Sequence, residues 1–263
     1  MRIRRIFPAA GLAAIVLSGL LRPACAGALL APPGEGEIIT TASFSSSARA
    51  FDAQGKLVPI PAYDKFELAS YIEYGVDEKL TLVARPSFSV YPSAAADPRD
   101  AASADLGARL SLFSSVDTAI SLQDLLHLPA NPTAQQTNVL DDETAFGDDL
   151  SLLITRSFTI GGYAAFIDVA GGYRWQLWLP DEWHADATFG IRPLPQFLWL
   201  VQSFATISRS TAAFPSYSSL KLQVSGVYDL SRAFSVQVGL FETIAGRNSG
   251  RELGTAAGLW YRF

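Results

Sequence analysis

The feature that most constrains this chain is a two-residue alternation of apolar and polar side chains, which recurs along most of its length. In the stretch LKLQVSGVY, for example, Leu220, Leu222 and Val224 alternate with Lys221 and Gln223. Successive side chains of a β-strand point to opposite faces, so this period predicts strands with one apolar and one polar face. The pattern predicts an all-β fold.

Twelve segments carry the alternation, although serine and threonine blur it in the first, it is short in the fifth, and the ninth begins apolar on both faces. The predicted strands cover residues 37–46, 65–74, 80–91, 104–113, 116–124, 149–156, 162–174, 183–192, 196–206, 219–228, 233–242 and 252–263. After residue 26 the longest purely apolar run of note is 197–201. A membrane-spanning helix needs about 20 apolar residues, so any membrane crossing must be made by strands.

The predicted connections alternate between long and short. The long ones are 47–64, 92–103, 125–148, 175–182, 207–218 and 243–251, and the short ones are 75–78, 114–115, 156–161, 193–195 and 229–232. An even number of strands with short turns at one rim and long loops at the other is typical of bacterial outer-membrane barrels. A soluble sandwich gives no reason for turns to sort by length. We therefore predict a single up-and-down antiparallel transmembrane β-barrel of about twelve strands.

The first 26 residues have the pattern of a cleaved signal peptide. Arg2, Arg4 and Arg5 precede an apolar stretch at 11–21, and Ala24-Cys25-Ala26 forms an A-x-A cleavage site. This pattern favours a signal peptide over a membrane helix or a lipid-anchored cysteine. The predicted organisation is a signal peptide at 1–26 and an outer-membrane β-barrel at 27–263, in the cell outer membrane of a Gram-negative bacterium.

Cleavage changes the composition of the exported chain. It removes the only cysteine, so disulfides play no part in the predicted mature protein. It also removes four of the 20 basic residues and none of the 25 acidic ones. An acidic exported protein is not expected to bind nucleic acid. The expected partners are outer-membrane lipid and the barrel-assembly machinery.

The last strand is apolar on one face to the end of the chain. Tyr261 and Phe263 share the outward face of GLWYRF with Leu259. A C-terminal aromatic of this kind resembles the signal that the barrel-assembly machinery reads, so we assign that role to Tyr261 and Phe263. An aromatic girdle at the short-turn rim is predicted from Tyr74, Tyr163, Trp199, Tyr228, Phe234, Tyr261 and Phe263.

The opposite, inward face carries charges of both signs in near balance. The lumen-lining candidates are Lys65, Glu67, Glu73, Arg85, Asp105, Arg109, Asp168, Arg174, His184, Asp186, Arg192, Lys221, Glu252 and Arg262, with Asp117 and Asp149 in the same register. The aromatic residues predicted to face inward are Tyr71, Tyr91, Phe113, Phe166 and Trp260. These side chains could pair across strands, line a narrow pore or plug it. A twelve-stranded lumen lies between filled eight-stranded barrels and open porins.

Motifs for enzymes, metals and cofactors are not found. No serine has a G-x-S-x-G context, His127 falls in a predicted loop, and His184 falls on the inward face. The acidic stretch 140–149 lacks the spacing of an EF-hand loop and is predicted to be solvated loop. We predict neither a catalytic residue, a metal site nor a cofactor.

Several stretches together resemble the XagA-like family of exported bacterial proteins. They are ARAFDAQGKLVPIPAYDKFELASYIEYGV, TLVARPSF, RSFTIGG to AAFIDVAGGYR, DATFGIRPLP, LVQSF with FPSY, VYDLSRAFSVQVG and IAGRNSGRE. Members are associated with exopolysaccharide and biofilm loci resembling those for poly-N-acetylglucosamine. The resemblance implies an outer-membrane barrel that exports polymer, and it carries over no functional residue.

Two functions remain open from the sequence. The first is a narrow pore or export channel for a polysaccharide or small solutes. The second is a structural or adhesive surface barrel with a closed lumen, whose predicted loops 47–64 and 125–148 contact matrix polysaccharide.

Overall fold

The computed structural model describes residues 27–92, 99–130, 145–212 and 214–263. In that part of the chain, long antiparallel strands follow one another round a single sheet. The sheet also includes one two-residue strand, β12. The strands are β1 Gly36–Phe51, β2 Leu57–Gly75, β3 Leu80–Tyr91, β4 Arg99–Ser114, β5 Thr118–Pro129, β6 Gly147–Ile160, β7 Tyr163–Gln176, β8 Glu182–Leu194, β9 Phe197–Ser208, β10 Ser218–Asp229, β11 Phe234–Arg247, β12 Ser249–Gly250 and β13 Leu253–Arg262. Within these residues no helix has the length and apolar character to cross a membrane.

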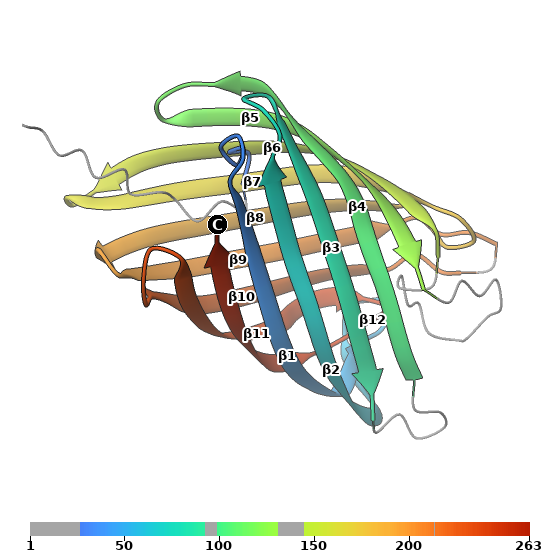
Figure 1. The fold of residues 1–263 in the computed structure, drawn as a ribbon. Coiled ribbons are helices and arrows are strands. Elements are labelled where there is room, and N and C mark those ends of the chain that lie inside the picture. Colours follow the sequence, from blue (N-terminus) through green and yellow to red (C-terminus); the bar gives the residue numbers. More distant parts are fainter. Residues whose placement is uncertain (1–26, 93–98, 131–144, 213) are drawn as a thin grey trace, which may run out of the picture.

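The sheet closes on itself through β1. This strand pairs with β2 on one side and with β13 on the other, so the first and last long strands lie side by side in the wall (Figure 1). The register sets Glu37 opposite Arg262 and Ile38 opposite Tyr261. Closure pairs the edges that an open sheet would leave exposed, and the predicted twelve-stranded antiparallel barrel is confirmed.

The outer wall of the barrel is apolar. Leu82, Leu106, Val169 and Val224 are each between 44% and 49% exposed, and their strand neighbours on the other face are polar or small except for the buried Val83. A continuous apolar band open to the surroundings is unfavourable in water but matches the hydrocarbon of a bilayer. The exterior is therefore the lipid-facing surface of a transmembrane barrel.

The short turns lie at or beside the predicted ones, except that β6 continues through Ile160 and reduces the turn predicted at 156–161 to 161–162. They cover 76–79, 115–117, 161–162, 195–196 and 230–233, all at the rim where β13 ends. The long connections at the other rim are shorter than predicted, because the strands continue beyond the alternating segments. In place of a loop at 47–64, β1 continues to Phe51 and β2 begins at Leu57.

Two features prevent this β1–β2 extension from being predicted from the sequence. The register shifts between Ser47 and Arg49, and Pro61 falls in that irregular part of the pairing with β2. A bulge accommodates a proline that a regular ladder would exclude. Strand ends beyond the lipid need no apolar face, so their sequence need not alternate.

The predicted loop 125–148 is likewise partly strand. β5 continues through Pro129, so His127 lies in a strand and not in a loop, and β6 begins at Gly147. Residues 131–144 lie outside the described residues.

One predicted face is also wrong. A register shift between Ser111 and Phe113 in the β4–β5 ladder turns the end of β4 over. Phe113 pairs with Ile120 on the outward face and is 52% exposed, instead of facing the lumen.

Aromatic side chains gather at both rims. All seven residues of the predicted girdle at the short-turn rim are exposed, and Tyr261 stacks against Phe234 and Phe263. At the other rim Tyr173 meets Trp175 and Trp183 edge-on, which forms a second aromatic cluster. Amphipathic rings favour the headgroup level of a bilayer, so the two clusters mark the two interfaces.

Candidate functional site

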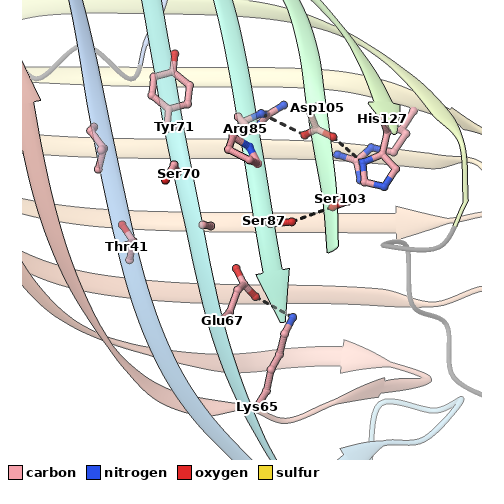
Figure 2. A pocket seen from close by; sticks show the side chains of 14 residues that line it. Thr41, Lys65, Glu67, Ser70, Tyr71, Arg85, Ser87, Ser103, Asp105 and His127 are labelled. Carbon is pink, nitrogen blue, oxygen red and sulfur yellow. Dashed lines mark hydrogen bonds and ion pairs between the residues drawn. The ribbon is translucent and has the colours of Figure 1, made fainter. Parts of the chain in front are cut away.

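The half of the lumen toward the long-connection rim contains a cavity of about 380 Å³ (Figure 2). Its wall comes from β1 to β5 and β7, and it lies beside Pro86, where the pairing between β2 and β3 is interrupted because proline has no N–H to donate. The polar side chains that line it are Thr41, Lys65, Glu67, Ser70, Tyr71, Arg85, Ser87, Ser103, Asp105, His127 and Arg174.

Charges in this cavity occur in pairs. Lys65 lies 2.8 Å from Glu67, and Arg85 lies 3.3 Å from Asp105. The hydroxyls of Ser87 and Ser103 are 2.8 Å apart on the wall between them (Figure 2). Paired charges and hydroxyls hold water and polar solutes without a strong preference for either sign.

His127 is a cavity residue that the sequence reasoning missed, because it fell in a predicted loop. Its Nδ1 lies 2.6 Å from Asp105 Oδ1, while its buried Nε2 has no hydrogen-bond partner in the described structure. The Asp105 carboxylate favours a proton on Nδ1, which makes Nε2 a buried acceptor beside the cavity. The inward alternation of β5 continues past the predicted strand end at 124 to Leu125 and His127, and this pattern could have revealed His127.

A second charged cluster surrounds Asp149. Its carboxylate lies 3.3 Å from Arg174 and 2.9 Å from His184, and it accepts a 2.6 Å hydrogen bond from Ser151. Gly172 leaves the space that His184 fills, since a Cβ there would lie 2.5 Å from the imidazole Nε2. Ser151 and Asp149 both approach this same nitrogen. A Ser–His–Asp relay needs them on opposite nitrogens, so the cluster fits a structural ion network.

The half of the lumen toward the short-turn rim is more tightly filled. Arg109 is 1% exposed and bonds the side chains of Tyr71, Glu73 and Gln123. The Tyr71 hydroxyl in turn donates to Glu73 over 2.9 Å. Four side chains thus compensate one another where water is excluded.

An apolar cluster occupies the facing wall of this inner half. It consists of Phe166, Leu198, Leu200, Val227 and Trp260, with Ile39 packed against it. Phe166 and Trp260 are aromatic residues that the alternation predicts to face inward. Trp260 also donates from Nε1 to Gln237 over 3.0 Å. This cluster explains why the predicted strand 196–206 begins apolar on both faces, because Leu198 and Leu200 face a packed interior.

The segment before β1 lies inside the barrel, which the sequence did not predict. Ala28 is fully buried and packs with Ala119 and Leu153, two inward residues of β5 and β6. Arg109 donates to the Leu29 carbonyl over 2.9 Å. Residues 27–33, hereafter the N-terminal segment, therefore occupy part of the lumen beside the Arg109 network.

The remaining lumen candidates also lie on the inner face. Arg192 lies 2.8 Å from Asp229, Lys221 lies 3.3 Å from Glu252, and Arg262 lies 2.6 Å from Glu37. Asp186 is half-buried on β8, and Asp168 is buried on β7. Asp117 differs, since it lies in an exposed turn beside Arg156.

No group of acidic, histidine or cysteine side chains in the described ranges has the geometry to hold a metal ion. Residues 140–144 of the acidic stretch lie outside those ranges, while Asp148 and Asp149 belong to β6. The prediction of a solvated loop therefore does not apply to Asp148 and Asp149.

A closed antiparallel barrel with an apolar exterior, two aromatic clusters and a charged interior defines a class: this is an outer-membrane β-barrel protein of the Gram-negative type. Comparison with solved structures agrees. The fold is similar to the COG4313 outer membrane channel from Pseudomonas putida F1, with TM-score 0.70 and 14% identity over 92% of this chain and 99% of that chain. It is also similar to the NanC porin, with TM-score 0.53 and 7% identity over 84% and 98% of the two chains.

A third similar fold is the β domain of the Bordetella autotransporter BrkA, with TM-score 0.50, 12% identity and coverage of 88% and 100%. No family model matches the sequence, and no curated protein matches it. At these identities the likeness is one of fold, so function must be argued from the lumen itself.

Proposed function

We propose that this protein is a narrow outer-membrane channel for polar solutes, linked to exopolysaccharide and biofilm production. The observation that carries the proposal is the cavity of about 380 Å³ in the lumen of the barrel, lined by charged and hydroxyl side chains. A barrel that served only as a scaffold would gain from an apolar filling, because buried charge is costly to maintain.

The interior is filled by side chains and by the N-terminal segment in the half near the short-turn rim. There the N-terminal segment lies against β3 to β7, and the Phe166–Trp260 cluster fills the facing wall. Passage through this half requires the N-terminal segment to shift, because the paired strands hold the backbone of the wall in place. The conducting state therefore depends on how firmly residues 27–33 are held.

The chemistry of the cavity supports an uncharged or weakly charged saccharide as the solute. The charges that line this cavity are paired, and Tyr63 and Tyr91 lie with ring centroids 6.4 Å apart near Lys65. Tyrosine faces and paired polar groups suit sugar rings, which present apolar faces and hydroxyl edges. The resemblance to the XagA-like family supports the same substrate class and an export direction.

The test is single-channel conductance of the purified protein in planar bilayers. We expect small conductance steps from the wild type and larger ones from a variant lacking residues 28–32, which frees the inner lumen. Trp260→Ala should also enlarge the steps, while Trp199→Ala, on the lipid-facing surface, should leave them unchanged. A soluble chitooligosaccharide added to one side should reduce the current through the enlarged channel.

A second candidate is a structural or adhesive barrel with a closed lumen. The packing of Ala28, Ala119 and Leu153 favours it, because this contact seals part of the inner half. Its predicted contact loop 47–64 is reduced to residues 52–56 between β1 and β2. The absence of conductance from the wild type, the truncated variant and Trp260→Ala would support this second function and contradict the channel.

A further inference from the structure

The N-terminal segment is held inside the barrel by hydrogen bonds to several strands. Ala28 N donates to Thr155 Oγ1 over 2.6 Å, and the Ser121 hydroxyl donates to the Ala28 carbonyl over 2.5 Å. Ala31 N donates to Thr81 Oγ1 over 3.1 Å. These contacts fix the backbone of the segment, and with it the position of Gly27.

Gly27 lies directly against two polar side chains of the inner wall. A Cβ at this position would stand 2.2 Å from Asp168 Oδ1 and 2.3 Å from Thr155 Oγ1, closer than atoms can approach. Only glycine brings the backbone this near to the carboxylate. The residue that follows the predicted cleavage site is therefore the one in contact with Asp168.

Asp168 is a buried carboxylate with an unsatisfied atom. It is 8% exposed, and its Oδ1 has no hydrogen-bond partner in the described structure. The nearest cation in the network, Arg109, is already engaged by Glu73, Gln123 and the Leu29 carbonyl. Burial of an ionised carboxylate is costly when no cation lies directly against it, so a cation beside Asp168 Oδ1 would stabilise this part of the inner wall.

The predicted processing of the chain supplies that cation. Hydrolysis of the Ala26–Gly27 peptide bond by a signal peptidase consumes one water and leaves a carboxylate on Ala26 and an ammonium group on Gly27. We propose that this α-ammonium forms an ion pair with Asp168 inside the barrel, and that this pair anchors the N-terminal segment in the lumen.

The pair can form only in the processed chain. Before cleavage the nitrogen of Gly27 is an uncharged amide with one hydrogen, whereas the ammonium has three donors and a positive charge. Asp168 Oδ1 lies beside Gly27 and has no other hydrogen-bond partner in the described residues, so it can accept from one of those donors. Removal of the signal peptide thus creates the cation that pairs with Asp168 on the inner face of the barrel. This inference rests on cleavage after Ala26 and is independent of whether the barrel conducts.

Zero-length crosslinking of the purified mature protein tests the contact directly. A carbodiimide joins an amine and a carboxylate in contact into an amide with loss of one water, which peptide mass spectrometry locates. We expect a Gly27–Asp168 crosslink in the wild type and in Asp186→Asn, an inward acid on the adjacent strand β8. The Lys221–Glu252 pair, 3.3 Å apart, serves as the internal positive control.

The rate of amine labelling provides a second measurement. The α-amine of Asp168→Asn should react with an acylating reagent at least tenfold faster than that of the wild type, and Gly27→Ala should show the same change while it keeps the carboxylate. Formation of the Lys221–Glu252 crosslink without the Gly27–Asp168 one, together with equal labelling of wild type and Asp168→Asn, would overturn the proposal. So would a mature N-terminus at a residue other than Gly27.

Discussion

Phe263 and Gly36 exchange two backbone hydrogen bonds across the seam of the barrel. Phe263 N donates to Gly36 O over 3.0 Å, and Gly36 N donates to Phe263 O over 2.9 Å. The Phe263 ring lies over Gly36 so closely that a Cβ on the glycine would stand 2.6 Å from it. The last residue of the chain therefore forms the end of the β1–β13 pairing and not a loose tail.

Replacing Phe263 by Asp should impair assembly of the barrel. The substitution places a charge at the lipid interface and removes the ring that packs on Gly36 and Tyr261. We expect low outer-membrane levels with normal synthesis and signal cleavage, measured by fractionation and immunoblotting. Phe263→Tyr should assemble normally.

Arg262 is a poor neutral control for that experiment. Its guanidinium lies 2.6 Å from the buried Glu37, so Arg262→Ala would leave a carboxylate without its partner. Wild-type levels of Phe263→Asp in the outer membrane would show that the C-terminal ring is dispensable for assembly.

Adjacent positions in the middle of β10 should respond oppositely to the same charge. Val224 is lipid-facing and Gln223 is on the inner face, where it bonds Gln202 and Ser225. Val224→Arg should cost roughly 2–4 kcal/mol, as expected for a guanidinium at the bilayer midplane. Gln223→Arg should cost far less, since its head can reach water or an acid. Urea unfolding in liposomes measures both, and equal losses would contradict the register.

The buried Arg109 should matter much more than the exposed Arg156. Arg109→Ala leaves Glu73 without its partner in a filled part of the lumen, which costs roughly 3–5 kcal/mol. Arg156 and Asp117 form an ion pair 3.7 Å apart that is mostly exposed, so Arg156→Ala should change stability by about 0–1 kcal/mol. The temperature at which the folded form disappears from heat-modifiability gels compares them. A larger shift for Arg156→Ala is the contrary result.

The two rims should be distinguishable on intact cells. A single cysteine at Ala53, between β1 and β2, should react with an impermeant maleimide, whereas one at Asp77 or Ser231 should not. The expectation follows from outer-membrane barrels, whose short turns face the periplasm. Labelling at Asp77 and Ser231 but not at Ala53 would reverse the orientation.

Much of this architecture follows from the sequence by itself. A strand that crosses a bilayer must present apolar groups outward along its whole lipid-facing length. Outward apolar residues therefore alternate with inward residues along all of that length, and the sequence shows this pattern directly. Leu222 and Val224 against Lys221 and Gln223 are enough to orient β10. The same physical demand places Tyr261 and Phe263 at the interface, and it sets the number and sequence order of the strands.

Outside the lipid a strand needs no apolar outward face. Only the tertiary structure decided how the strand ends pair there and which way their side chains point. The ends of β1 and β2 pair through a bulge, and another bulge turns Phe113 outward; neither depends on local alternation. The contact between Gly27 and Asp168 joins positions far apart in the chain. Neither residue is unusual in its own sequence neighbourhood. Their meeting depends on the curvature of the closed wall and on the path of the N-terminal segment within it.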